Sequence, residues 1–180
     1  MDDQQVWDIG MMRLEGLFSG LSAGTRFALA QQLTRYRKAK EALAAVVVNV
    51  AAASLCRECG GQCCLNGKYR VNVFDALAHV AIQIPVAADF SQKPLCPYGA
   101  ATGCTMEPGM RPADCIVFLC DGIDEKVSLQ DRAILAAQER DVRECIQEAS
   151  FLMGELLGSP LLLWAEKNSN TSKLKVQRQI

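Results

Sequence analysis

Residues 56–64 read Cys-Arg-Glu-Cys-Gly-Gly-Gln-Cys-Cys, and this stretch opens the part of the chain that decides the fold. Eight of the nine cysteines lie in the run that it begins. They are Cys56, Cys59, Cys63, Cys64, Cys96, Cys104, Cys115 and Cys120. Glycine and proline also concentrate in this run, and no long helical periodicity crosses it. We therefore predict an irregular, cysteine-rich centre with one short β-hairpin at residues 98–103.

Helical patterns precede this centre. Two helices have suitable N-caps: Asp2 or Asp3 for the first and Ser22 for the second. The second helix is predicted to run from residue 23 towards residue 54, with Phe27 turned inward. The cluster of basic residues in its middle, residues 35–40, is interpreted as a solvent-exposed face.

Shorter patterns follow inside and after the centre. Residues 69–73 alternate between apolar and polar side chains, which suggests a short strand. Asn72 with Asp75 is a variant of the capping box and predicts a helix through residue 81. Ser128 then opens a last helix, whose apolar stripe extends to residue 156. Cys145, the ninth cysteine, lies on this stripe and is interpreted as a small buried hydrophobic residue.

These patterns predict a mainly α fold that forms one globular unit in four parts. An N-terminal helical segment covers residues 1–55, and the cysteine-cluster metal-binding domain covers residues 56–122. A C-terminal helix, residues 123–164, packs on the first segment, because each carries an apolar stripe that needs cover. A loose polar tail covers residues 165–180. A homodimer is a second arrangement that could cover the stripes.

Composition excludes several classes of function. Lys plus Arg is 19 and Asp plus Glu is 20, so the net charge of −1 provides no field that would attract nucleic acid. The most apolar segment, residues 42–55, is shorter than a membrane span. The acidic start, residues 1–5, lacks the features of a secretory signal, so we expect a cytoplasmic protein and no membrane partner.

The cysteine spacing points to metal chemistry, since thiols are kept reduced in the cytoplasm. Two residues separate Cys56 from Cys59, which lets both sulfurs reach one ion from a tight turn. Gly60 and Gly61 permit a positive φ and a close approach of backbone N–H groups to sulfur. All-thiolate ligation is common to zinc sites and iron–sulfur clusters. A thiol–disulfide redox protein is the third alternative.

Other side chains near the cysteines are assigned lesser roles. The single histidine, His79, is interpreted as a satisfied surface or core residue rather than a ligand. Glu107, Asp114 and Asp121 are expected to be solvated carboxylates. Arg111 is expected either to offset thiolate charge or to belong to a simple helix start.

Four motifs together resemble a known family: Cys56 to Cys64 as quoted above, Cys96-Pro97-Tyr98, Gly103-Cys104-Thr105-Met106 and Arg111-Pro112-Ala113-Asp114-Cys115. The family is that of the YkgJ-like cysteine-cluster proteins, also called the zinc- or iron-chelating domain. The resemblance covers about a third of the chain. It implies metal chelation by Cys56, Cys59, Cys63, Cys64, Cys96, Cys104 and Cys115. A related domain in flagellin lysine methylases is associated with an iron–sulfur cluster. Cys120 stands where many members have another residue, and the gap after Cys59 is often one residue shorter in the family.

The sequence therefore favours a cytoplasmic protein that chelates an iron–sulfur cluster of the 4Fe–4S type through the central cysteines, with a role in electron transfer or redox sensing and a protein redox partner. The first alternative is a structural zinc module with four-cysteine sites for protein interaction. An enzymatic role remains open, although the chain lacks a phosphate-binding loop, a nucleophile elbow and a dinucleotide fingerprint.

Overall fold

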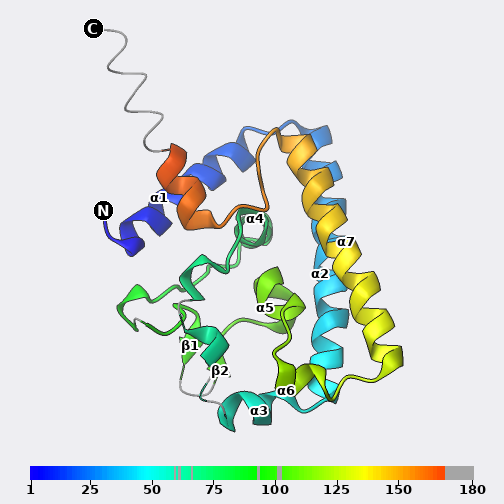
Figure 1. Ribbon diagram of the computed structural model, residues 1–180. Coiled ribbons are helices and arrows are strands. Elements are labelled where there is room, and N and C mark those ends of the chain that lie inside the picture. Colours follow the sequence, from blue (N-terminus) through cyan, green and yellow to red (C-terminus); the bar gives the residue numbers. More distant parts are fainter. Residues whose placement is uncertain (59, 61, 66, 93, 101–102, 169–180) are drawn as a thin grey trace, which may run out of the picture.

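The computed structural model describes residues 1–58, 60, 62–65, 67–92, 94–100 and 103–168 (Figure 1). Its helices are α1 (Asp3–Ser19), α2 (Ala23–Asn49), α3 (Ala52–Glu58), α4 (Val73–Ile82), α5 (Ala113–Val117), α6 (Asp121–Asp124) and α7 (Leu129–Met153). Residues 161–168 are also helical. Two strands, β1 (Gly99–Ala100) and β2 (Gly103–Cys104), and four 3₁₀ turns, η1 (Gln62–Cys64), η2 (Gly67–Tyr69), η3 (Phe90–Gln92) and η4 (Pro108–Met110), complete the described elements. The mainly α fold class is confirmed.

The predicted helix starts are confirmed, because each depends on a side chain within three residues of the amide it caps. Asp2 and Asn72 both form reciprocal capping boxes, at the starts of α1 and α4. Ser22 and Ser128 accept hydrogen bonds from the third residues of α2 and α7 at 3.1 Å each.

The second helix is shorter than predicted. α2 ends at Asn49, and α3 begins at Ala52 after a break in the chain direction. Ala51, in the break, has a φ of 53°, the left-handed conformation that commonly ends a helix. The prediction for Phe27 is also wrong, since its side chain is 68% exposed.

The strand predicted at residues 69–73 is wrong. Within this range, residue 69 ends η2, and Val73 begins α4. The backbone of this stretch instead pairs with the chain that follows α7: Leu161 N donates to Val71 O, and Val73 N donates to Ser159 O, both at 2.9 Å. α7 stops at Met153, earlier than the apolar stripe predicts, because Gly154 adopts a φ of 65°.

Helices α2 and α7 lie side by side and form one long layer of the molecule (Figure 1). Arg35 of α2 forms ion pairs with Asp141, Glu144 and Glu148 of α7. The predicted packing of the C-terminal helix on the N-terminal segment is therefore confirmed. Cys145 is fully buried in this layer, as predicted, and its burial raises the pKa of the thiol to about 11.

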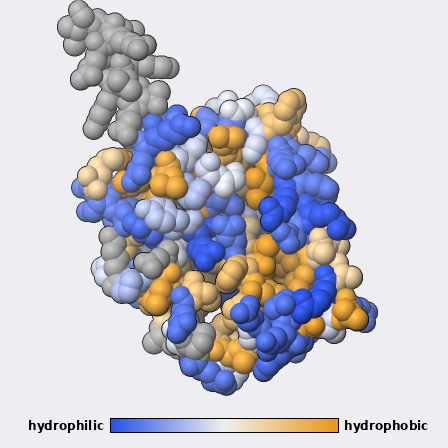
Figure 2. All heavy atoms as spheres, viewed as in Figure 1, coloured by the Kyte–Doolittle hydropathy of each residue, from blue (hydrophilic) through white to orange (hydrophobic). Residues whose placement is uncertain are grey.

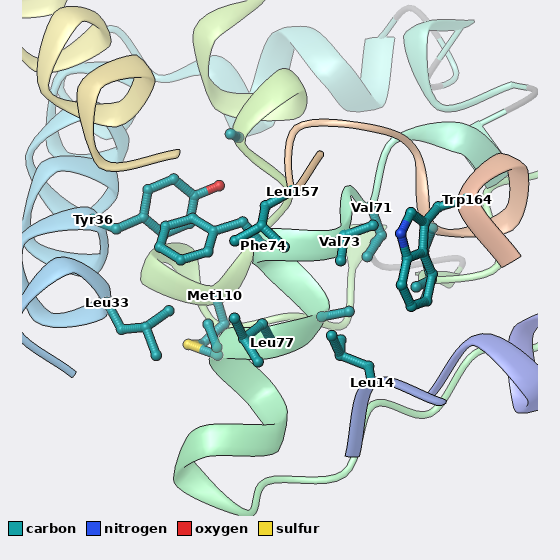
Figure 3. Close-up of a cluster of buried hydrophobic side chains, with 14 of the residues drawn as sticks. Leu14, Leu33, Tyr36, Val71, Val73, Phe74, Leu77, Met110, Leu157 and Trp164 are labelled. Carbon is teal, nitrogen blue, oxygen red and sulfur yellow. The ribbon is translucent and has the colours of Figure 1, made fainter. Parts of the chain in front are cut away.

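The core surrounds α4, whose first seven residues are all buried. The rings of Tyr36 and Phe74 are 4.7 Å apart between centroids, and Leu14, Leu77 and Leu157 complete a fully buried cluster (Figure 3). This core joins α1 and α2 to α4 and to the segment after α7. No described helix has the length and apolar character needed to cross a membrane.

One basic residue of α2 contradicts the prediction of a solvent-exposed face. The Lys40 side chain is only 1% exposed, and its Nζ donates to Asp75 Oδ1 at 2.7 Å. A buried ammonium needs a paired anion, and this partner lies 35 residues away in the chain. The spacing of residues within α2 carries no information about such a partner.

Candidate metal centre

The structure places the predicted cysteine ligands on short elements between α2 and α7. Cys56 lies in α3, Cys63 and Cys64 in η1, Cys104 in β2 and Cys115 in α5, while Cys120 caps α6 and Cys96 lies in the loop before β1. Of these, Cys63, Cys64, Cys96, Cys104, Cys115 and Cys120 are free thiols. Cys59 lies outside the described residues. Cys96 is buried, Cys56 and Cys120 are half-buried, and Cys63, Cys64, Cys104 and Cys115 are exposed.

An isolated antiparallel bridge brings Cys64 to Cys96. The bridge joins Leu65 to Leu95. In an antiparallel pair, the residue before one partner lies opposite the residue after the other, so Cys64 faces Cys96. Burial, followed by the neighbouring Cys63, Cys96 and Cys104, raises the pKa of the Cys64 thiol to about 11.

The hairpin adds Cys104 to this group. β1 and β2 pair antiparallel with Gly99 opposite Cys104, which confirms the hairpin predicted at residues 98–103. Gly99 N donates to Cys96 O at 2.8 Å, so the turn before β1 holds Cys96 next to the same pair. Cys96 therefore lies at the start of this turn, and Cys104 lies opposite Gly99 at its end.

Cys115 reaches the group from α5. Surrounding protein atoms and the neighbouring Cys96 and Cys104 raise the pKa of its thiol to about 12, although the residue keeps some contact with solvent. The Cys64, Cys96 and Cys115 thiols are therefore disfavoured as anions in the metal-free chain. A metal cation in their midst would reverse that preference, since metal ligands must be deprotonated.

Cys56 and Cys120 lie on two elements, α3 and the start of α6, that contact each other. Helix α3, which carries Cys56, contacts both β2 and α6, and Cys120 is the N-cap of α6 (Figure 1). Electrostatic interactions link Cys63, Cys64, Cys96, Cys104 and Cys115, which are here called the thiol cluster. Cys56 and Cys120 occupy contacting elements on its flank.

A glycine lets the backbone approach the thiol cluster. A Cβ built on Gly67 would lie 2.8 Å from Cys96 Cβ and 2.9 Å from Cys96 Sγ, closer than real side chains allow. Gly60, next to Cys59 in the chain, has a φ of 64°, as the sequence predicts for this glycine.

The arginine near the cluster is not the one that the sequence singles out. Arg111 Nε donates to Met106 O at 3.2 Å. Arg70 instead places its guanidinium 5.7 Å from the centre of the Phe118 ring, and its charge lowers the pKa of the Cys96 and Cys115 thiols. Arg70 is not adjacent to any cysteine in the sequence, so the spacing of the cysteines does not indicate that it lies near them.

His79 lies in the core with 5% of its surface exposed, and burial lowers its pKa. Its Nδ1 lies 3.3 Å from Ile84 O, but its Nε2 has no hydrogen-bond partner among the described residues, so the predicted satisfied histidine is only half satisfied. Asp114 is exposed, as predicted, although partial burial and the nearby Asp75 raise its pKa. Glu107 and Asp121 are exposed, as predicted.

The donor chemistry of the thiol cluster fits a soft metal. Within the described part of the chain, no three His, Cys, Asp or Glu side chains already surround one point as metal ligands do. The cluster nevertheless joins five sulfur donors from four separate elements, with a cationic guanidinium beside them. Binding would draw these short elements together, which couples metal uptake to ordering of the centre.

An open cleft of about 640 Å³ adjoins the cluster. Arg70, Asp114 and Phe118 line its cysteine side, and Leu135 and Glu139 of α7 line the other. Figure 2 shows hydrophobic side chains gathered beside α7 on this face, bordered by hydrophilic ones. The lining includes Asp114, which precedes Cys115 in the chain, and contains no described cysteine.

Comparison with known proteins leaves the resemblance as a prediction. No protein-family model, curated protein or solved structure matches the chain.

Proposed function

We propose that the protein binds metal through its central cysteines and that the bound group is an iron–sulfur cluster, most simply of the 4Fe–4S type. The observation that supports this most is the thiol cluster. The neighbouring Cys63, Cys96 and Cys104 raise the pKa of the Cys64 thiol, and Cys96 and Cys104 raise the pKa of the Cys115 thiol. Cys104 also raises the pKa of the Cys96 thiol. A 4Fe–4S cluster takes four such cysteine ligands.

The surroundings also suit a thiolate-bound metal group. The charge of Arg70 offsets thiolate charge, and Gly67 leaves room for backbone beside Cys96. Groups that contact the ligands of a metal, without binding the metal themselves, tune its affinity and its reduction potential. With several thiols exposed beside an open cleft, electron exchange with a protein partner, or redox sensing, is the role that follows.

Structural zinc uses the same ligands and is the second candidate. Zinc would hold the short elements together by tetrahedral ligation and make the centre a module for protein interaction. The observation that favours zinc is the lack of regular structure around the cluster, since zinc sites commonly replace a hydrophobic core in such small regions.

The first experiment is anaerobic purification followed by measurement of iron, zinc and acid-labile sulfide per chain, together with the visible spectrum. We expect about four iron atoms and four sulfides and a brown protein. Zinc without colour would transfer the function to the structural module. A metal-free protein whose thiols cycle to disulfides would overturn both metal assignments.

Variants then test the ligands. Cys64→Ser, Cys104→Ser and Cys115→Ser should each lose most of the bound metal, and Cys59→Ser is predicted to do the same. Cys145→Ala is the matched control, because this ninth cysteine is buried between α2 and α7. Metal loss in the Cys145 variant alone would show that the thiol cluster is not the binding site.

A further inference from the structure

Helix α5, which presents Cys115, lacks a cap of its own. Its N-cap residue is Pro112, which forms no side-chain hydrogen bond to the helix. The first amides of a helix have no partner within the helix and need an outside acceptor. Ala113, the first residue of α5, donates its N–H to Asp75 Oδ2 at 3.3 Å. The acceptor thus comes from α4, 38 residues earlier in the chain.

Asp75 is held rigidly at this position. Its Oδ1 accepts hydrogen bonds from Tyr36 OH at 2.8 Å and Lys40 Nζ at 2.7 Å, and its Oδ2 also accepts one from Asn72 N at 3.3 Å. With Ala113, four donors occupy the four acceptor positions of the carboxylate. The side chain is fully buried. The carboxylate therefore has one orientation, set jointly by α2 and α4.

The chain that leads into α5 is fixed to the same surface. η4 packs on α2 so closely that a Cβ on Gly109 would lie 2.7 Å from Glu41 Cγ. Contacts between α2 and α5 continue this packing past Ala113. Two residues after Ala113, Cys115 is near enough to Cys96 and Cys104 for their charges to raise the pKa of its thiol.

A purely stabilising role would not require this arrangement. Buried ion pairs contribute little net stability compared with apolar residues of the same size, because the desolvation of both charges offsets their attraction. What the pair supplies is direction: a charged acceptor binds an amide N–H more strongly than a neutral one and fixes its position.

We propose that Asp75, neutralised by Lys40, is a positioning residue of the metal centre: it caps α5 from within the core and so sets the place of Cys115 relative to Cys96 and Cys104. The metal part of this inference rests on the function proposed above. The placement of Cys115 stands on the contacts of the metal-free chain.

The test is Ala113→Pro. Proline removes the N–H that Asp75 accepts and puts a ring carbon in its place, so α5 must shift, while the Lys40–Asp75 pair stays intact. Proline is tolerated at the first helical position. Pro112 has a ψ of 137°, which is the extended conformation required before proline.

Leu129→Pro is the matched control. Leu129 is the first residue of α7, follows Ser128 with a ψ of 160°, and is 88% exposed. It introduces the same residue at the same helical position, outside the elements that carry the predicted metal ligands. For each variant we would measure bound metal, its visible spectrum and, in the metal-free protein, the alkylation rate of Cys115 by peptide mass spectrometry.

For Ala113→Pro we expect metal affinity to fall about 10- to 100-fold, as for other substitutions that disturb the orientation of a metal ligand. The holoprotein that remains should have an altered visible spectrum. The rate of Cys115 alkylation should change, because the thiol moves relative to its neighbours. Leu129→Pro should match the wild type in all three. Wild-type affinity and alkylation rate in Ala113→Pro, or equal changes in both variants, would overturn the positioning role.

Two further outcomes separate this inference from the proposed function. If the wild type binds no metal, the proposed function fails, and the Cys115 alkylation rates alone decide whether Asp75 positions α5. If circular dichroism shows that Ala113→Pro is unfolded, the neutral double variant Asp75→Leu/Lys40→Met replaces it. It removes both acceptor oxygens without leaving an unpaired charge, and it should change the rate of Cys115 alkylation if Asp75 acts as proposed.

Discussion

The layer formed by α2 and α7 differs in construction from the thiol cluster, whose residues lie between these two helices in the sequence. The two helices are long, capped by serine side chains and packed along an apolar seam. The elements that carry the predicted metal ligands are at most seven residues long, and contacts such as the Leu65–Leu95 bridge and the Asp75–Ala113 hydrogen bond hold them in place.

The difference shows how stability and function are divided in this protein. The helical layer and the core around α4 hold most of the buried apolar side chains of the described chain. The elements that carry the predicted metal ligands keep four exposed thiols and little apolar cover of their own. If a metal binds there, its ligation supplies the cross-links that packing does not.

Metal removal should break this comparison most strongly. Chelation of the bound metal should abolish protection from hydrogen exchange in the elements that carry the predicted metal ligands, while amides of α2 and α7 stay protected. Structural metal sites contribute on the order of 10 kcal/mol to folding of the region they hold. Peptide-resolved exchange before and after chelation measures this directly.

Simultaneous loss of protection in both regions would instead mean that they unfold as one unit. The buried Cys145 provides an internal reference: its peptide should retain slow exchange until the helical layer itself opens.

The next largest effect should come from the core polar pair. Asp75→Ala leaves the Lys40 ammonium buried without its anion, which should lower the free energy of unfolding by about 3–5 kcal/mol. Urea denaturation gives this number. The double variant Asp75→Ala/Lys40→Met should be more stable than Asp75→Ala, since the uncompensated charge is gone. A double variant less stable than the single one would show that Lys40 contributes chiefly through its packing.

Gly67→Ala should affect the thiol cluster more than the helical layer. The added Cβ would overlap Cys96, so this loop must shift, at a cost of about 1–3 kcal/mol. We expect weaker metal binding, measured by competition with a chromophoric chelator. Gly122→Ala is the control, because a Cβ there meets no atom within 4 Å. Equal metal affinity in the two variants would contradict the close approach at Cys96.

The smallest effect should be the response of the core to pH. Burial lowers the pKa of His79 in the folded protein below its unfolded value of about 6.5, so the folded chain binds fewer protons than the unfolded one below that pH. The contribution of His79 to stability is therefore intact above pH 6.5 and declines as the pH falls towards the folded pKa.

Urea denaturation of the wild type and His79→Gln between pH 7.5 and 5.5 isolates this contribution, because all other titrating groups are common to both. We expect a smaller decrease in stability for His79→Gln over this range. Parallel pH profiles would show that His79 keeps an ordinary pKa in the folded protein.

Several predictions from sequence are correct because they depend on neighbours a few residues apart. The caps at Asp2, Ser22, Asn72 and Ser128 each join groups three residues apart. The hairpin at residues 98–103 likewise follows from local turn residues.

The predictions that are wrong depend on distant partners or on the exact end of an element. Lys40 resembles a surface lysine in the sequence, and only the fold places Asp75 beside it. Residues 69–73 have the pattern of a strand, but a 3₁₀ turn ends at residue 69 and α4 begins at Val73, so only a short link between them pairs with the segment after α7. Likewise, the stripe of α2 continues past the left-handed turn at Ala51, since alanine there carries no stop signal.

The amino-acid sequence by itself determined the mainly α class, the positions of the caps and a donor set made of thiols, because composition and short spacings carry these properties. Only the tertiary structure decided which thiols meet, that Arg70 rather than Arg111 stands beside them, and that Asp75 caps α5. These depend on contacts such as the one between Ala113 and Asp75, 38 residues apart. Such contacts form only when packing of the core brings separate elements together, so no local pattern can encode them.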